Sequence, residues 1–345
     1  MKKLYKVLIA FGLCSVLVLT SVGAAFAADG KSYKNLPYTY YTYLGDSIPF
    51  GYGLVSQEAS SDPYSVGTRV PNSYPDLVGD VLEDVNGAHI QPAACSGARL
   101  MDYRILLERG MGVENPYDRP SDWYGNRKAE RTERLRGMGP EIVRWVQQSD
   151  LVSIQAGFND ITAALVNAAY ATGIVDLNKL QGLSDADAVL DYLSFALNNL
   201  EKDPDLLGNF TRTFSEEMSE MFTNAYVVIK DLQLLAPNKA DILLVGYNKA
   251  VASIRVIPGT DRSLLFDLVD EAIMAFDGYF AFLATQYDNV HYVHVPDAET
   301  VYPKGTTVFD MLKDTGGILL GIHANEAGHR YIADRILDTL QEINQ

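Results

Sequence analysis

The stretch "YTYYTYLGDSIPFGYG", residues 38–53, runs an aromatic, β-prone segment into a Gly-Asp-Ser turn. Tyr40–Leu44 is predicted to be a strand, because aromatic side chains suit a pleated, half-buried surface. Ser47 follows it, and open α/β folds place their active sites just beyond the carboxyl ends of parallel strands. Gly, Asp and Ser are also the residues that any turn favours. The stretch therefore leaves two interpretations of Ser47, a nucleophile or an ordinary turn hydroxyl.

Similar short apolar runs recur along the chain, and long helical patterns separate them. This alternation is typical of parallel strands joined by crossover helices that cover both faces of the sheet. The last helix is well defined, since Asn325 can cap it and Ile332, Ile336 and Leu340 recur on one face. The sequence therefore predicts a three-layer α/β fold. The expected strands are Tyr40–Leu44, Ala88–Ala93, Leu151–Gln155, Ile242–Tyr247 and Val290–Val295, and the expected helices before the last are Tyr74–Leu82, Leu100–Glu108, Pro140–Gln148, Glu216–Leu235 and Leu264–Tyr287.

Residues 1–27 are typical of a secretory signal peptide. Three lysines precede the apolar run Val7–Leu19, and Ala25-Phe26-Ala27 forms a small-x-small exit, so cleavage is expected after Ala27. The alternative, an uncleaved membrane anchor, is disfavoured because the run is shorter than the roughly 20 residues that a spanning helix needs. We expect residues 28–345 to be exported and secreted as a single domain without stable membrane insertion.

The exported part of the chain is strongly acidic. Loss of three lysines lowers Lys+Arg from 28 to 25 against 44 Asp+Glu, so the formal charge moves from -16 to -19. Such a charge argues against nucleic acid and anionic lipid as partners. Only Cys95 remains after cleavage, which excludes an internal disulfide. Residues 109–139 and 165–213 fit the alternation poorly and are expected to be insertions on the ligand side of the sheet.

Three further segments hold residues that acyl transfer requires. "AACSGARL" leaves the second expected strand through Gly97, which lets a backbone N–H approach a ligand closely. "SIQAGFND" offers the side-chain amide of Asn159, while Asp160 can cap the next helix. "GIHANEAGHRYIAD" places His323 on a loop before the last helix. Each segment alone is also explained as an ordinary turn, a helix start or a structural histidine, but together with Ser47 they supply nucleophile, base and donors.

In the order of these motifs the chain resembles the SGNH hydrolases, also called the GDSL esterase and lipase superfamily. The matching residues are Ser47 in "GDSI", Gly97 in "CSGAR", Asn159 in "GFND" and His323 in "IHANEAGH". The resemblance implies a flavodoxin-like five-stranded parallel sheet, with Ser47 as nucleophile and His323 as base. It also implies an oxyanion hole formed by the Ser47 and Gly97 backbone N–H groups and the Asn159 side chain, with no metal or organic cofactor.

The chain departs from the family pattern before His323. Many members carry an aspartate three residues before the histidine, and here that position is Leu320. The imidazole is then held by a backbone carbonyl, or by a displaced acid such as Asp314 or Asp310, or the enzyme is weak. We favour a Ser-His dyad supported by a carbonyl, because a neutral acceptor still fixes the tautomer.

Other patterns give weaker hypotheses. A Gly-x-Ser-x-Gly nucleophile elbow is absent from the sequence. His291 and His294 should point to opposite faces of a strand, which is wrong for joint metal ligation, so we expect packing or surface roles. His329 in the last helix is expected to be a structural or surface residue. A sugar-stacking platform is an alternative to plain strand propensity for five tyrosines, which are Tyr38, Tyr40, Tyr41, Tyr43 and Tyr52.

The resemblance and the residues together predict a secreted carboxylic ester hydrolase that works through an acyl-serine intermediate. Its substrate would be a small-molecule, lipid or acylated-glycan ester. A phospholipase or long-chain lipase and a carbohydrate deacetylase are alternatives within the same fold, because substrate choice lies in loops that vary independently of it. From another class, a binding protein that has kept the fold and lost the reaction is motivated by the missing aspartate.

Overall fold

The computed structural model describes residues 33–54, 67–118, 133–176, 202–237, 240–248, 264–301 and 323–345, together with single positions between 179 and 200. The expected signal peptide at residues 1–27 lies outside these ranges, as do residues 119–132 of the first expected insertion. Among the helices of the described ranges, none combines the length and the apolarity that crossing a membrane requires.

Five parallel strands form a sheet in the order β2-β1-β3-β4-β5. β1 is flanked on both sides, so that Gly45 at its end pairs with Ala94 of β2 and with Gln155 of β3. The expected five-stranded parallel sheet is confirmed, and each strand lies within two residues of its predicted ends. The strands are β1 (Tyr40–Gly45), β2 (His89–Ala94), β3 (Leu151–Gln155), β4 (Asp241–Val245) and β5 (Val290–Val293).

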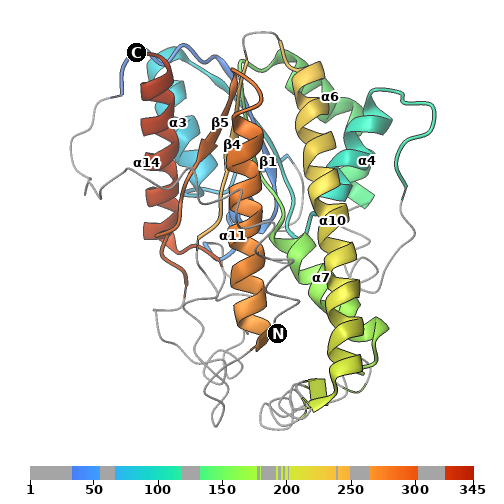
Figure 1. Cartoon of the computed structure of the whole chain (residues 1–345). Helices are drawn as coiled ribbons and strands as arrows, with labels where there is room; N and C mark the ends of the chain where they lie inside the picture. Colours follow the sequence, from blue (N-terminus) through green and yellow to red (C-terminus); the bar gives the residue numbers. More distant parts are fainter. Residues whose placement is uncertain are drawn as a thin grey trace.

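Helices cover both faces of the sheet, as Figure 1 shows. α3 (Tyr74–Asn86) and α14 (Glu326–Ile343) pack against each other on one face. α4 (Leu100–Gly110), α6 (Gly139–Gln148), α10 (Pro204–Leu235) and α11 (Leu264–Ala284) lie on the other. α14 begins as predicted, since the side chain of Asn325 accepts a hydrogen bond from the Gly328 N–H at 2.8 Å. The three-layer architecture is confirmed.

The largest differences from the sequence-based expectation concern α7 (Phe158–Ala171) and α10. α7 was expected only as an uncharacterised helix start, and α10 begins at Pro204 instead of Glu216. The first part of α10 contains Gly and β-branched residues, which are weak helix formers. Its helical form is supported by packing, because Phe210 and Phe214 stack with ring centroids 6.2 Å apart and are buried. In Figure 1, α7 and the first half of α10 extend past the sheet, at the edge where the strands end.

The tyrosines around β1 belong to the core. Tyr38, Tyr41 and Tyr43 are at most 2 % exposed, because β1 is a central strand with both faces covered. The Tyr41 hydroxyl is hydrogen-bonded to Ser153 Oγ at 2.8 Å, and the Tyr38 hydroxyl donates to Asp241 at 2.6 Å. The sugar-stacking interpretation is therefore wrong for Tyr38, Tyr41 and Tyr43, whereas Tyr40 and Tyr52 are partly exposed.

Candidate active site

Ser47 is the first residue of α2 (Ser47–Phe50), the short helix that follows β1. Asp46 caps this helix by accepting the Ile48 N–H at 3.0 Å. The entry into the turn depends on Gly45, whose φ of 140° is rare for any side-chain-bearing residue. A Cβ there would lie 2.2 Å from the carbonyl oxygen of Gln155. The sharp turn that presents Ser47 at the sheet edge thus requires glycine immediately after the strand.

His323 is brought against Ser47 by the fold. The Nε2 atom of His323 lies 2.7 Å from Ser47 Oγ, and the two residues are 4 % and 9 % exposed. The backbone carbonyl of His323 accepts the Val301 N–H at 2.9 Å, and the Tyr52 ring lies beside the imidazole with centroids 4.7 Å apart. An imidazole nitrogen at this distance is within reach of a proton on the serine oxygen.

The turns carrying Gly97 and Asn159 flank Ser47, because β2 and β3 are the two neighbours of β1. Gly97 adopts a φ of 84°, and the Asn159 side-chain amide donates to the Ala98 carbonyl at 3.2 Å, which joins the two turns. Within the described residues, the backbone N–H groups of Ser47 and Gly97 donate no hydrogen bond. All of the residues predicted to form the site, apart from those before His323, therefore lie along one edge of the sheet.

The residues considered for orienting the His323 imidazole are not among those that the structure describes. Asp310, Asp314 and Leu320 fall within residues 302–322, outside the described part of the structure. The choice between a carbonyl and a displaced acid stays a hypothesis from the sequence.

Two side chains that the sequence analysis assigned no role connect these turns. The Tyr247 hydroxyl donates to Asp46 Oδ2 at 2.6 Å and accepts the Phe158 N–H at 3.2 Å. Gln155 donates through Nε2 to the Gly246 carbonyl at 2.6 Å, and its own carbonyl accepts the Asp46 N–H at 2.9 Å. The signal that could have identified Tyr247 is its place at the end of an expected parallel strand.

Burial perturbs the acid next to Ser47. Burial raises the pKa of Asp46 to about 7, against the opposing effect of hydrogen bonds from Tyr247 and Ile48 that favour the carboxylate. The carboxyl group can therefore change its charge near neutral pH, one residue from the serine.

Asp160 does not cap the helix after β3, which corrects the sequence-based expectation. The N-cap position belongs to Gly157, whose φ is 142°, and Asp160 lies inside the first turn of α7. Its Oδ2 accepts the N–H of Leu100 at 3.0 Å, one of the first N–H groups of α4, which lack intrahelical partners. Burial raises the pKa of Asp160 to about 7, although Arg99 nearby lowers it. Asp160 thus connects the Asn159 turn to the start of α4.

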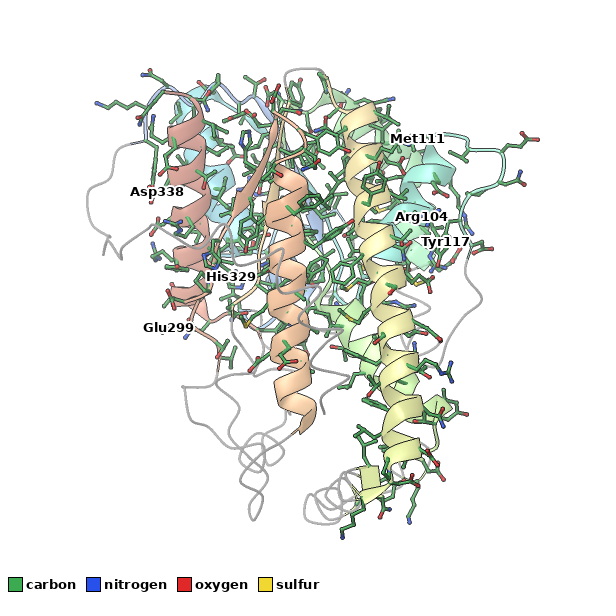
Figure 2. All side chains as sticks on the ribbon, viewed as in Figure 1. Arg104, Met111, Tyr117, Glu299, His329 and Asp338 are labelled. Atoms are coloured by element: carbon green, nitrogen blue, oxygen red, sulfur yellow. The ribbon has the colours of Figure 1, made fainter. Side chains whose placement is uncertain are left out.

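The remaining histidines have structural surroundings. His329 is fully buried at the start of α14 (Figure 2), where its Nδ1 accepts the Tyr74 N–H at 3.1 Å. Burial, and then the nearby His323, lower the pKa of His329 to about 3, so it stays neutral. His291 contacts Asp241 at 3.0 Å, and His294 lies beyond the end of β5. These placements fit the structural or surface roles expected for the three residues.

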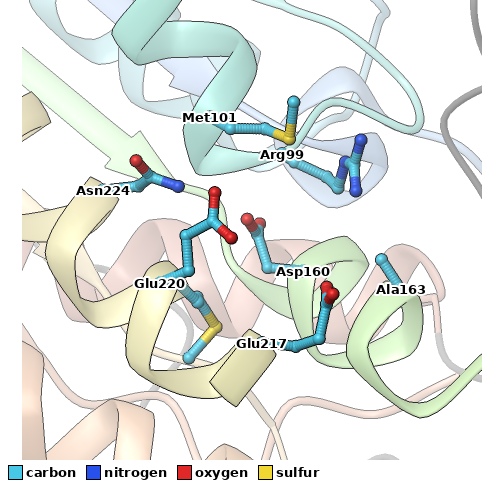
Figure 3. Close-up of a pocket in the computed structure, with 8 residues that line it drawn as sticks. Arg99, Met101, Asp160, Ala163, Glu217, Glu220 and Asn224 are labelled. Atoms are coloured by element: carbon cyan, nitrogen blue, oxygen red, sulfur yellow. The ribbon is translucent and has the colours of Figure 1, made fainter. Parts of the chain in front are cut away.

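A small open cleft lies beside the Asn159 turn, between the start of α4, α7 and α10 (Figure 3). The carboxylates of Asp160, Glu217 and Glu220 line it together with Arg99 and Asn224. Glu217 accepts the Asn167 side-chain amide at 3.3 Å, and the hydroxyl of Tyr117 donates to Glu220. No group of three or more His, Cys, Asp or Glu within the described residues is arranged to hold a metal ion.

Comparisons with known proteins find similar solved structures, all at low sequence identity. No family model matches the sequence, and no curated protein matches it. An extracellular lipase from Streptomyces rimosus is similar, with 17% identity, a TM-score of 0.47, and coverage of 87% of this chain and 99% of that one. A phospholipase A1 from Streptomyces albidoflavus shares 17% identity with a TM-score of 0.44, covering 88% of this chain and 99% of its own.

A third similar structure is that of a protein from Parabacteroides merdae named as a putative GDSL-like lipase. It is 13% identical, with a TM-score of 0.35, and the match covers 88% of this chain and 96% of that one. Scores of this size carry no conclusion about activity. The class of fold is instead defined by the five-stranded parallel sheet and by the helices on both of its faces, as the SGNH resemblance implies.

Proposed function

We propose that this protein is a secreted serine hydrolase of the SGNH type that cleaves carboxylic esters through an acyl-serine intermediate. The observation that carries the proposal is the 2.7 Å contact between His323 Nε2 and Ser47 Oγ, made by residues 276 positions apart. Both side chains are buried at the edge of the sheet where open α/β folds bind their ligands. The contact also has a specific setting, because the serine is the first residue of a helix that follows a glycine with a positive φ at the end of β1.

The reaction would follow from these positions. His323 takes the proton of Ser47 while the serine oxygen attacks the ester carbonyl, because a serine hydroxyl is a weak nucleophile until a base removes its proton. The imidazolium then gives this proton to the leaving alcohol. A water molecule, activated by His323 in the same way, attacks the acyl-serine and releases the carboxylic acid. The enzyme returns to its starting protonation.

The developing oxyanion would be stabilised by the Ser47 and Gly97 backbone N–H groups and by the Asn159 amide. The two backbone donors have no acceptor among the described residues, which leaves them available to a ligand. One preorganised donor of this kind is worth on the order of 10²- to 10³-fold in turnover.

A serine-directed fluorophosphonate probe tests this proposal. We expect the probe to label the wild-type protein at Ser47, and we expect Ser47→Ala to lose labelling and to lose ester hydrolysis by at least about 10³-fold. Ser153→Ala is the matched control, because Ser153 is a fully buried serine of β3 bonded to Tyr41 and lies outside the site. A folded wild-type protein that resists the probe would favour the binding-protein alternative and would sink the enzyme proposal.

The acyl chain distinguishes the alternatives within the fold. A series of p-nitrophenyl esters from acetyl to palmitoyl compares a short-chain esterase or glycan deacetylase with a lipase or phospholipase. A preference for palmitoyl would exclude the deacetylase alternative.

A further inference from the structure

Tyr247 is fixed on three sides beside the proposed site. It lies just beyond the end of β4, is 1 % exposed, and packs its ring against Phe158 and Phe276, with centroids 6.0 Å and 6.4 Å away. Its backbone N–H donates to Asp277 of α11 at 3.1 Å. The position of its hydroxyl is therefore set by β4 and α11, which carry neither of the turns that the hydroxyl contacts, and by the Phe158 ring at the start of α7.

The hydroxyl joins two turns that carry different parts of the site. Its proton goes to Asp46 Oδ2 at 2.6 Å, and its oxygen accepts the N–H of Phe158 at 3.2 Å. Asp46 immediately precedes Ser47, and Phe158 immediately precedes Asn159. One oxygen atom thus connects the residue before the nucleophile with the residue before the side-chain amide donor.

Both contacts fill needs that the local structure leaves open. The Phe158 N–H is the first of α7 and has no acceptor within the helix. Asp46 is 1 % exposed, and a carboxyl group at that depth needs hydrogen-bond partners for both of its oxygens. Its other oxygen is used by the Ile48 N–H. Without the tyrosine hydroxyl, each turn would lose one buried hydrogen-bond partner.

We infer that Tyr247 is a positioning residue of the proposed esterase, whose hydroxyl holds the Ser47 turn and the Asn159 turn in register. The inference rests on the proposed function. It predicts an effect on the transition state, because the serine oxygen and the amide donor must both reach the reacting carbonyl, and small misplacements of such groups are costly. Ground-state binding of the ester depends much less on this register.

The test compares Tyr247→Phe with Tyr41→Phe. Each variant deletes one buried hydroxyl and keeps its ring, but among the described residues the Tyr41 hydroxyl is bonded only to Ser153, within the sheet. We expect both variants to lower the melting temperature by similar amounts. Tyr247→Phe should lower kcat by about 10-fold or more with KM changed less than about twofold, whereas Tyr41→Phe should keep both constants.

A double-mutant cycle adds a readout that a merely structural role would not move. Asp46→Asn leaves one acceptor oxygen, which the Ile48 N–H needs, and puts an NH₂ group in place of the oxygen that accepts the Tyr247 proton, so it should lower kcat as well. Because both changes act through the same hydrogen bond, the double variant should lose less than the product of the single losses. If Tyr247→Phe fails to fold, Asp46→Asn alone is measured, and an unchanged kcat in that variant overturns the inference.

The two proposals fail in different ways. If the wild-type protein is active and Tyr247→Phe keeps its kcat while losing stability like Tyr41→Phe, Tyr247 is a packing residue and only the inference is wrong. If the folded wild-type protein neither hydrolyses esters nor reacts with the fluorophosphonate, the proposed function fails and the positioning role fails with it.

Discussion

At the scale of single residues, Asp46 both caps α2 and has a raised side-chain pKa. Its side chain accepts from Ile48 and Tyr247, yet burial raises its pKa from 3.8 to about 7. The folded protein therefore holds a proton on Asp46 over a pH range in which the unfolded chain has released it. This difference makes stability depend on pH through one residue.

We predict that Asp46→Asn changes the pH dependence of stability. Between the unfolded pKa of 3.8 and the folded pKa of about 7, the free energy of unfolding of the wild-type protein falls with rising pH, because the folded carboxyl must give up its proton. The amide of the variant does not titrate. When the pH is raised from 5 to 7, the free energy of unfolding of the variant should therefore rise by about 2 kcal/mol relative to that of the wild type.

Urea denaturation of both proteins at the two pH values measures this change. Equal differences in free energy at pH 5 and pH 7 would show that Asp46 is ionised in the folded state at both. Loss of its hydrogen bonds lowers the stability of the variant at both pH values and does not affect the comparison.

At the scale of elements, the start of α7 depends on a close approach between backbone and an aromatic ring. Gly157 caps α7 with a φ of 142°, and a Cβ at this position would lie 2.4 Å from the Phe276 ring of α11. The same ring packs beside Tyr247. The helix that carries Asn159 is thus set against α11 without room for a side chain.

We predict that Gly157→Ala is far more costly than Gly173→Ala. Gly173 follows the other end of α7 and also has a positive φ, 71°, but a Cβ there meets no atom within 4 Å. The control should cost about 1 kcal/mol for its left-handed backbone. Gly157→Ala adds the clash with Phe276, for a total of about 3 kcal/mol or more, and it should lower ester hydrolysis.

Thermal and urea unfolding of both variants, with kcat measured on the same samples, tests this element. Equal losses of stability at the two glycines would mean that α7 and α11 can separate without cost.

At the scale of the whole molecule, charge repulsion opposes the compact fold. The chain has 44 acidic and 28 basic residues, for a formal charge of -16. Partly exposed ion pairs, such as those from Arg69 to Asp76, Asp80 and Glu83 of α3, contribute little because water and salt screen them. Repulsion among the excess carboxylates acts over longer distances and is also reduced by salt.

We predict that salt stabilises the protein at pH 8. Raising sodium chloride from about 10 mM to about 150 mM shortens the screening length from roughly 30 Å to roughly 8 Å, so the melting temperature should rise by a few degrees. The same titration near the isoelectric point of about 4.7 is the control, because the net charge is small there. A melting temperature that falls with salt at pH 8 would show that ion pairs outweigh the repulsion.

Much of the fold was predictable because strand pattern and helix periodicity are local properties. All five strands lie within two residues of their predicted ends, and Asn325 caps the last helix as expected. α7 and the beginning of α10 were harder to predict, because the segments that they pack against lie far away in the sequence. Asp160 illustrates the limit, since its place shortly after the third expected strand suggested a helix cap while the start of α4 determined its actual partner.

The sequence by itself determined the approximate positions of the five strands, the order of the four motifs along the chain, and the residue types from which an acyl-transfer site can be built. Only the tertiary structure decided that His323 Nε2 meets Ser47 Oγ across 276 residues, that Tyr41 and Tyr43 of β1 belong to the core, and that Tyr247 joins Asp46 to Phe158. The physical reason is that propensity and periodicity act within a few residues, whereas these contacts are fixed by sheet pairing, burial and helix packing between distant segments.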